Sequence, residues 1–183
     1  MSKDNQTSQE FLDWIKTVLL ALVLAFFIKI FVMDATKVEG NSMLNTLHSG
    51  DMLFVDKISQ HFKGYERGDI VIIEAPDNED TLYIKRIVGL EGDHILIDDG
   101  NVYINGEIYN EPYTNTEDTL TTSGQSEWTV GEGEYFVMGD NRLPNASNDS
   151  RNFGPINEES IVGHAFLRFY PLYDIGFVDK DNK

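Results

Sequence analysis

Two segments far apart in the sequence carry side chains that could together perform acyl-transfer chemistry. Ser42 lies in EGNSMLNTLHSGD (Glu39–Asp51), where neighbouring glycine and asparagine leave its hydroxyl uncrowded. Lys85 lies in YIKRIVGLEGD (Tyr83–Asp93), among apolar residues that would strip water from its ammonium group. Desolvation lowers the pKa of a lysine, and a neutral lysine can take the proton of a serine hydroxyl. These two segments predict a serine nucleophile with a lysine general base.

Strand alternation decides what surrounds Lys85. If residues 82–88 form a strand, Tyr83, Lys85 and Ile87 share one face and Arg86 points to the other. Only one of the two adjacent cations then needs to reach solvent. Periodicity alone favours an ordinary surface lysine in a half-buried strand. Ser42 taken alone is also more simply explained as a turn residue, since serines in segments rich in glycine and asparagine often lie in turns. No GxSxG elbow surrounds it, so an α/β-hydrolase is disfavoured.

A third polar cluster, GDNRLPNASNDSRNFGPI (Gly139–Ile156), has the composition of a tightly hydrogen-bonded loop. Asp149 and Arg151 are close enough in sequence to form a fork-type ion pair. Ser147 could hydrogen-bond a neighbouring amine. The alternative is a solvated loop with no role in chemistry.

The residue types that usually bind metals offer no recognisable site. The chain has 4 histidines and no cysteine, which excludes disulfides, thiolate metal sites and a cysteine nucleophile. The histidines lack HExxH spacing. We therefore expect neither a metal nor a cofactor. A serine–histidine–aspartate arrangement stays open, although no local pattern proposes it.

Beyond residue 34 the sequence is typical of a mostly antiparallel β domain. Short runs rich in Val, Ile, Phe and Tyr alternate with Gly, Asn and Asp turns. The clearest local prediction is a hairpin in HILIDDGNVYINGE, with its reversal at Asp98–Asn101. The segment Tyr113–Glu127 is polar and predicts a long loop. The predicted strands are Met52–Ile58, Asp69–Glu74, Leu82–Val88, His94–Asp98, Val102–Ile104, Glu134–Met138 and Ile161–Tyr170.

The N-terminal segment predicts a membrane anchor. Residues 1–10 are polar and expected to be disordered, and residues 11–33 form the long apolar run FLDWIKTVLLALVLAFFIKIFVM. Its most apolar part, residues 17–33, is at the lower limit of about 17 residues for a membrane-spanning helix. A cleaved signal sequence would need Ala-x-Ala after the run, and a globular amphipathic helix would need a polar face. The predicted organisation is a tail (1–10), a transmembrane helix (11–33) and a β-rich domain (34–183).

The charge balance bears on the class of partner. The chain has 31 acidic and 14 basic residues, a formal net charge of -17. The phosphate backbone would repel so acidic a domain, so we expect no nucleic-acid partner. Solubility is the plainest consequence of this charge.

In order and content these segments resemble the type I signal peptidases, membrane-bound serine–lysine endopeptidases that remove signal peptides. EGNSMLNTL is similar to the family's nucleophile segment, RGDIVII (Arg67–Ile73) to its next strand, and YIKRIVGLEGD to its lysine strand. YINGEIYNEPY and the run GEYFVMGDNR…SNDSR also match. The resemblance covers nearly all of residues 11–170, in the single-anchor form of Gram-positive bacteria.

The resemblance implies roles for individual residues and a setting for the domain. It implies a mainly β, antiparallel, sheet- or barrel-like catalytic domain preceded by one transmembrane helix. The N-terminus would be cytoplasmic and the catalytic domain would lie outside the cytoplasm at the cell membrane. The implied partners are signal-peptide-bearing preproteins, cut after Ala-x-Ala, and membrane lipid. Ser42 aligns with the nucleophile, Lys85 with the general base, Ser147 with the serine that hydrogen-bonds the lysine amine, and Asp140, Arg142, Asp149 and Arg151 with supporting residues.

Two departures from the family pattern lie near the site. Asn45 stands where the family usually has proline, and Leu143–Ala146 lengthens the loop before Ser147. These differences keep open a specialised or low-activity homologue that acts as an accessory factor in surface-protein or pilus assembly. A soluble serine–lysine self-cleaving regulator is a further alternative, but it leaves the apolar run unexplained and the chain has no DNA-binding segment to match it.

Overall fold

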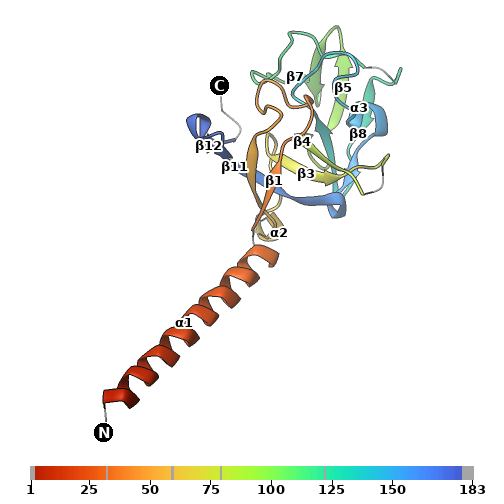
Figure 1. Ribbon diagram of the computed structural model, residues 1–183. Helices are drawn as coiled ribbons and strands as arrows, with labels where there is room; N and C mark the ends of the chain where they lie inside the picture. Colours follow the sequence, from red (N-terminus) through yellow and green to blue (C-terminus); the bar gives the residue numbers. More distant parts are fainter. Residues whose placement is uncertain (1–2, 32, 59, 79, 122, 179–183) are drawn as a thin grey trace.

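The computed structural model describes residues 3–178 except 32, 59, 79 and 122, and the side chains in this range except those of 3–9, 26–31, 60 and 61. Its first element, α1 (Lys3–Phe31), projects from the β domain as a single rod (Figure 1). The prediction of a disordered tail is therefore wrong for residues 3–10. Residues 1–2 of that tail and 179–183 of the predicted β domain lie outside the described residues.

The predicted anchor, residues 11–33, differs from the structure at its end. Met33 is already the first residue of strand β1 (Met33–Lys37), and residue 32 is not described. The described side chains of α1, residues 10–25, are exposed. In the ranges that the structure describes, no helix is both long enough and apolar enough to cross a membrane.

The larger of two sheets carries the nucleophile loop and the lysine strand. Its strands run in the order β1-β2-β11-β3-β4-β9-β10, with β12 paired to β11, and every pair is antiparallel. Within the described range no pair joins β1 to β10, so the sheet is open at both ends. The other strands are β2 (Met52–Asp56), β3 (Ile70–Glu74), β4 (Leu82–Gly89), β9 (Glu134–Met138), β10 (Ile156–Asn157), β11 (Ile161–Tyr170) and β12 (Gly176–Phe177).

The smaller sheet has the order β7-β6-β5-β8 and is built around two tight hairpins. Asp98 pairs with Asn101, so the reversal is Asp99-Gly100, and both residues have positive φ (45° and 77°). Asn-Gly and Asp-Gly suit such turns because these residues tolerate the left-handed region, and the predicted hairpin is confirmed. The strands are β5 (His94–Asp98), β6 (Asn101–Ile104), β7 (Glu107–Ile108) and β8 (Glu127–Thr129).

The helices after α1 are single turns, which is why no helical periodicity marks them in the sequence. They are α2 (Gln60–Lys63), α3 (Ser150–Phe153), η1 (Glu158–Ser160) and η2 (Leu172–Asp174). Between β7 and β8 the described residues form turns and irregular structure, as predicted for most of residues 113–127, although Glu127 already begins β8. The mainly antiparallel β prediction is therefore confirmed.

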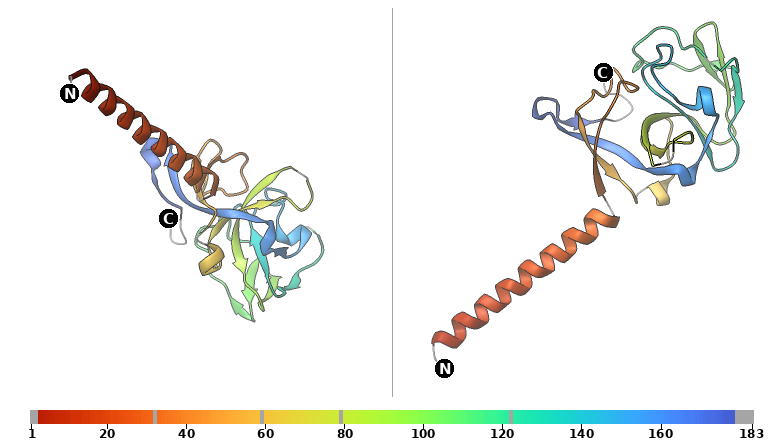
Figure 2. Two further views of the ribbon diagram at one scale, coloured as in Figure 1. Left: turned by 90° about the horizontal axis from the view of Figure 1, so that it is seen from below. Right: turned by 45° about the vertical axis from the view of Figure 1, so that its right-hand side comes forward.

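Burial on both faces of β3 fixes the elements that carry the catalytic candidates. Ile70 and Ile72 pack into one buried cluster with Met43 and Leu47 of the nucleophile segment. The alternate residues of β3 pack into a second cluster with residues of β4, β9 and β10. A third cluster, which includes Trp128, joins β4 and β9 to the smaller sheet. Figure 2 shows the two sheets as neighbouring parts of one domain, with α1 standing apart.

Candidate active site

Ser42 lies in the loop from β1 to β2, and packing on the core holds this loop. Val38 donates its backbone N–H to the carbonyl of Asp51 (2.8 Å), which ties the two ends of the loop together. Met43 and Leu47 are buried at 2% and 0% exposure. Because the residue after Ser42 is fixed in the core, the half-buried serine has a defined position at the domain surface.

Lys85 lies on β4 with its amine directed at Ser42. Its Nζ is 3.3 Å from Ser42 Oγ and 3.1 Å from the carbonyl oxygen of Ile84, and the Tyr83 ring lies 4.9 Å from the same nitrogen. The side chain is 3% exposed. Burial lowers the pKa of the Lys85 ammonium to about 8, against an opposing effect of the Asp149 carboxylate. The surface-lysine interpretation is therefore wrong.

Arg86 points away from Lys85, as alternation predicts, but neither cation reaches solvent. Arg86 is 1% exposed and donates to the Asp140 carboxylate from Nε (2.9 Å) and from its second terminal nitrogen (2.6 Å). It also donates to the carbonyl of Gly68 (2.8 Å), and its guanidinium lies 4.0 Å from the Tyr113 ring centroid. The buried charge is thus fully paired, which is the condition for its burial.

Ser147 lies near the dyad formed by Ser42 and Lys85 but does not make the predicted hydrogen bond. Its Oγ is buried and makes no hydrogen bond within the described part of the chain, although it lies beside the Asp149 carboxylate. The predicted hydrogen bond from Ser147 to the Lys85 amine is therefore not formed. Gly139 explains how closely the segments meet, because a Cβ there would collide with Ser147 Oγ and, at 2.5 Å, with the carbonyl oxygen of Ser42.

Asp149 and Arg151 form the fork-type ion pair predicted from the sequence. Arg151 donates from Nε to one carboxylate oxygen and from a terminal nitrogen to the other, both at 2.8 Å. The same carboxylate accepts the backbone N–H of Gly139 (3.0 Å). Burial alone would raise the pKa of Asp149, but Arg151 and the Gly139 N–H bring it below its usual range. The pair therefore stays ionised and fixes the loop against β9.

Comparison with known proteins identifies the family. The family model described as signal peptidase, peptidase S26, matches residues 11–170. The chain belongs to this family. It is 37% identical over 189 residues to signal peptidase I of Bacillus licheniformis, across 98% of this chain and 100% of that protein.

Two other relatives by sequence agree with this assignment. Signal peptidase I T of Bacillus subtilis (strain 168) is 39% identical over 173 residues, which cover 90% of this chain and 88% of the relative. Signal peptidase IB of Staphylococcus aureus (strain MRSA252) is 33% identical over 184 residues, covering 92% and 94%. A solved signal peptidase I from Enterococcus faecalis V583 is 35% identical, covers 55% of this chain and 95% of its own, and has a TM-score of 0.46.

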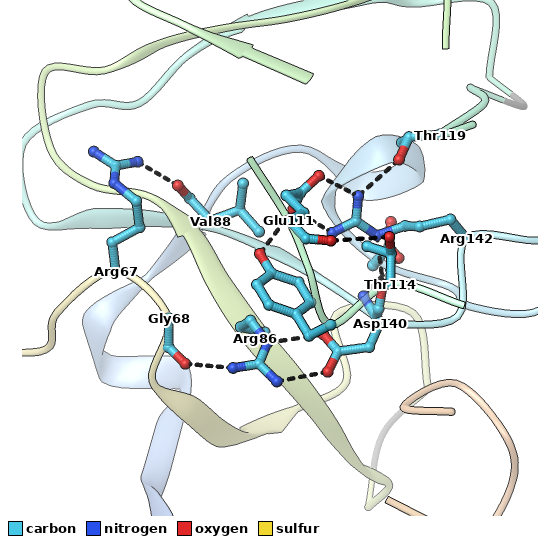
Figure 3. A network of polar contacts seen from close by, with 12 residues as sticks. Arg67, Gly68, Arg86, Val88, Glu111, Thr114, Thr119, Asp140 and Arg142 are labelled. Carbon is cyan, nitrogen blue, oxygen red and sulfur yellow. Dashed lines mark hydrogen bonds and ion pairs between the residues drawn. The ribbon is translucent and has the colours of Figure 1, made fainter. Parts of the chain in front are cut away.

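In this signal peptidase, Asp140 and Arg142 contact different partners rather than each other. Asp140 pairs with Arg86, whereas Arg142 is turned toward the segment after β7, as Figure 3 shows. Arg142 donates to both carboxylate oxygens of Glu111 (2.7 and 2.5 Å) and to Thr119 Oγ1 (2.8 Å). Both predicted supporting residues are thus buried anchor points, and Arg142 does not reach the dyad.

Sequence reasoning missed the partners of these anchors. Arg86 sits beside Lys85 in the lysine strand, and the apolar residues that follow it there are the signal that its charge is buried and needs a carboxylate. Thr46 Oγ1 donates to Asp140 (2.5 Å) and so ties the nucleophile loop to the same pair. Glu111 and Asn115 lie in polar sequence without periodicity. Nothing in their own spacing marks them as partners of the residues after β9.

A cleft of about 180 Å³ opens beside the dyad of this signal peptidase. Ser42 and Lys85 contribute their polar atoms to it, and β3 and β4 contribute aliphatic walls. A cleft of this size with such walls suits small apolar side chains rather than large ones. Its aliphatic lining comes from Val38, Met43, Ile72, Leu82 and Ile84.

Proposed function

We propose that this chain is the serine endopeptidase that removes N-terminal signal peptides from preproteins, with Ser42 as nucleophile and Lys85 as general base. The observation that carries the proposal is the 3.3 Å approach of Lys85 Nζ to Ser42 Oγ in the lining of a cleft that also has aliphatic walls. Membership of the signal peptidase family, and relatives named signal peptidase I across nearly the whole chain, support the substrate class.

The dyad performs the reaction in two halves. Neutral Lys85 takes the proton of the Ser42 hydroxyl as Oγ bonds to the scissile carbonyl carbon. The tetrahedral oxyanion then collapses, the C–N bond breaks, and the Lys85 ammonium gives its proton to the leaving amine. In the second half, Lys85 takes a proton from water, which attacks the acyl-enzyme, and the proton returns to Ser42 Oγ. The lysine ends each cycle neutral.

The backbone N–H of Ser42 is the proposed donor to the oxyanion. Backbone donors held in place before the reaction stabilise the developing charge without reorganisation. Gly40, two residues earlier, has φ +91° and open space around its α-carbon. It supplies no side-chain donor, so we assign the main stabilisation to the Ser42 peptide.

The substrate is proposed to bind as an added extended strand, which directs alternate side chains into the enzyme. The first and third residues before the cut would then enter the cleft beside Ser42. Its aliphatic walls, with Ile72 and Ile84 among them, favour small apolar side chains. This arrangement gives a physical reason for a preference for Ala-x-Ala.

We propose that the enzyme lies at the cell membrane, with residues 11–31 of α1 as a single anchor, the N-terminus cytoplasmic and the catalytic domain outside the cytoplasm. The apolar run and the exposed side chains along α1, such as Trp14 and Leu22, support this assignment. Membrane lipid is then a partner of the chain. The full chain is expected to stay with membranes after alkaline extraction, and release into the supernatant would contradict the assignment.

Cleavage of purified preproteins by the full chain in detergent tests the function. Ser42→Ala is expected to lower kcat by roughly 10³-fold or more, because removal of a nucleophile leaves only binding and oxyanion stabilisation. The wild-type rate is expected to rise with pH through about 8, since below that pKa Lys85 is an ammonium and cannot accept a proton.

Ser49→Ala is the matched control, since Ser49 is an exposed serine of the same loop. Cleavage by Ser42→Ala at the wild-type rate would remove the serine from the mechanism. Failure of folded wild type to cut several preproteins would instead favour the accessory role in surface-protein or pilus assembly.

A further inference from the structure

One residue, Asn141, holds the carbonyl groups on both sides of the Ser42 α-carbon, one through its side chain and the other through its backbone N–H. Asn141 donates from Nδ2 to the carbonyl oxygen of Asn41 (2.9 Å) and from its backbone N–H to the carbonyl oxygen of Ser42 (2.9 Å). Asn141 is 4% exposed and follows β9 in the third polar cluster. The peptide unit that carries the Ser42 N–H is therefore held from its carbonyl end.

A second asparagine orients the Asn141 side chain. Asn115 Oδ1 accepts the backbone N–H of Arg142 (2.9 Å), so Asn115 Nδ2 faces the other way and donates to Asn141 Oδ1 (2.6 Å). The backbone N–H of Leu143 also points at Asn141 Oδ1 (3.3 Å). With its oxygen held by two donors, the Asn141 carboxamide must present its NH₂ group to Asn41.

Asn115 is itself held by buried charge. The Arg142 guanidinium binds Glu111 and Thr119 on the two sides of Asn115 in sequence (Figure 3). The backbone N–H of Asn115 also donates to the carbonyl oxygen of Asp140 (3.3 Å). Most of the segment 111–119 is predicted from the sequence as a loop without a further role. Hydrogen bonds and an ion pair hold it against residues 140–142, and Asn141 among these contacts the nucleophile segment.

The position of the Asn41 carbonyl decides the position of the Ser42 N–H. In a planar trans peptide the C=O and N–H bonds point in opposite directions, so fixing one fixes the other. A hydrogen bond accepted at the carbonyl also polarises the peptide and strengthens its N–H as a donor. A donor aimed in advance at the oxyanion contributes in the transition state rather than in substrate binding.

We propose that Asn141, oriented by Asn115, is the positioning residue that aims and polarises the Ser42 N–H at the oxyanion. This inference rests on the proposed function of Ser42 and deepens it. Asn141 does not touch the substrate or the Lys85 amine. It acts through the peptide between Asn41 and Ser42, so it governs kcat and leaves KM and the ionisation of Lys85 unchanged.

The variant Asn141→Asp tests this role in the full chain. It keeps the shape of the side chain and an oxygen for Asn115, but it cannot donate to Asn41. We expect kcat to fall roughly 10²-fold, as when an oxyanion donor is lost. KM should stay within about threefold. The pH midpoint is measured in Asn115→Ala, which adds no charge near Lys85, and it should stay near about 8. A peptide aldehyde, which adds reversibly to Ser42 Oγ and leaves an oxygen facing the N–H, should bind more weakly by a similar factor.

Thr116→Val is the matched control, because it removes a hydrogen bond of the same segment, from the Thr116 hydroxyl to the carbonyl oxygen of Asp118, and leaves the hydrogen bonds of Asn115 and Asn141 in place. If Asn141→Asp does not fold, Asn115→Ala decides, with an expected fall in kcat of roughly tenfold from a weakened donor. Wild-type kcat in the folded variant, a shifted pH midpoint in Asn115→Ala or unchanged aldehyde affinity would each overturn the inference. Equal cleavage by Ser42→Ala and wild type would instead overturn the proposed function itself.

Discussion

Lys85→Met is expected to abolish cleavage and at the same time to stabilise the fold. The catalytic loss follows from removal of the general base and should reach roughly 10³-fold or more. The gain in stability follows from burial, because the ammonium is 3% exposed and its pKa falls to about 8. At neutral pH this depression costs the folded state roughly 3 kcal/mol relative to an unfolded lysine of pKa about 10.4. Methionine removes that cost.

The lost hydrogen bond to the Ile84 carbonyl offsets about 1 kcal/mol of this gain. The net stabilisation expected for Lys85→Met at pH 7 is therefore about 2 kcal/mol. The difference in stability between Lys85→Met and wild type depends on pH. Between about 8 and about 10.4 the unfolded lysine holds more proton than the folded one, so wild-type stability rises with pH in that window. The Lys85→Met variant should lack this rise.

Urea unfolding of both proteins at several pH values measures these terms. Lys63→Met is the matched control, because Lys63 is exposed on α2 and its replacement should change stability little. A Lys85→Met variant less stable than wild type at pH 7 would contradict the burial argument. A variant that cleaves preproteins would separately remove Lys85 from the mechanism.

The pair Ser42 and Lys85 is only partly predictable from its own residues. Alternation along β4 separates Lys85 from Arg86, but periodicity alone favours a surface lysine, and it is the resemblance of several segments to one family that assigns both residues their roles. The ion pair between Asp149 and Arg151 can be predicted from their spacing in the sequence. The carboxylate that pairs with Arg86 cannot be predicted in this way, because Asp140 reaches Arg86 only when β9 lies beside β4. Ser147 shows the same limit, since the resemblance implies a contact with Lys85 that the packing around Gly139 does not form.

The fold also has features that local sequence predicts and features that depend on pairing between distant strands. The hairpins at Asp99-Gly100 and Asn105-Gly106 follow from turn chemistry, and both reversals carry positive φ. Strand β1 has little apolar alternation in MDATK, and it is a strand because it pairs with β2 along its whole length. The two-residue strands β7, β10 and β12 are likewise products of pairing. Segment 113–127 has no periodicity, because side-chain hydrogen bonds rather than an apolar face hold it.

Glu111→Ala is expected to destabilise the domain by about 3–5 kcal/mol, because it leaves the Arg142 guanidinium buried without its carboxylate. Arg142 has a fully buried side chain, and that of Glu111 is 7% exposed. Burial alone would lower the pKa of Arg142, and the Glu111 carboxylate reverses this effect. Thr119 and the carbonyl of Gly139 still accept hydrogen bonds from Arg142, but neither compensates a charge. The melting temperature of the domain should fall by roughly 10 °C.

Charge, rather than side-chain volume, is the origin of this loss, and Glu111→Gln separates the two. Glutamine keeps an oxygen acceptor for Arg142 but no charge, so a loss of about 2–3 kcal/mol is expected if charge dominates. Glu107→Ala, an exposed glutamate of β7, should stay within about 0.5 kcal/mol of wild type. Arg142 also holds Asn115 in place. Among Glu111 variants that still fold, the less stable one should therefore have the lower kcat. Full stability of Glu111→Ala would mean that the ion pair does not hold the segment, and the support we assign to Asn141 would then come from elsewhere.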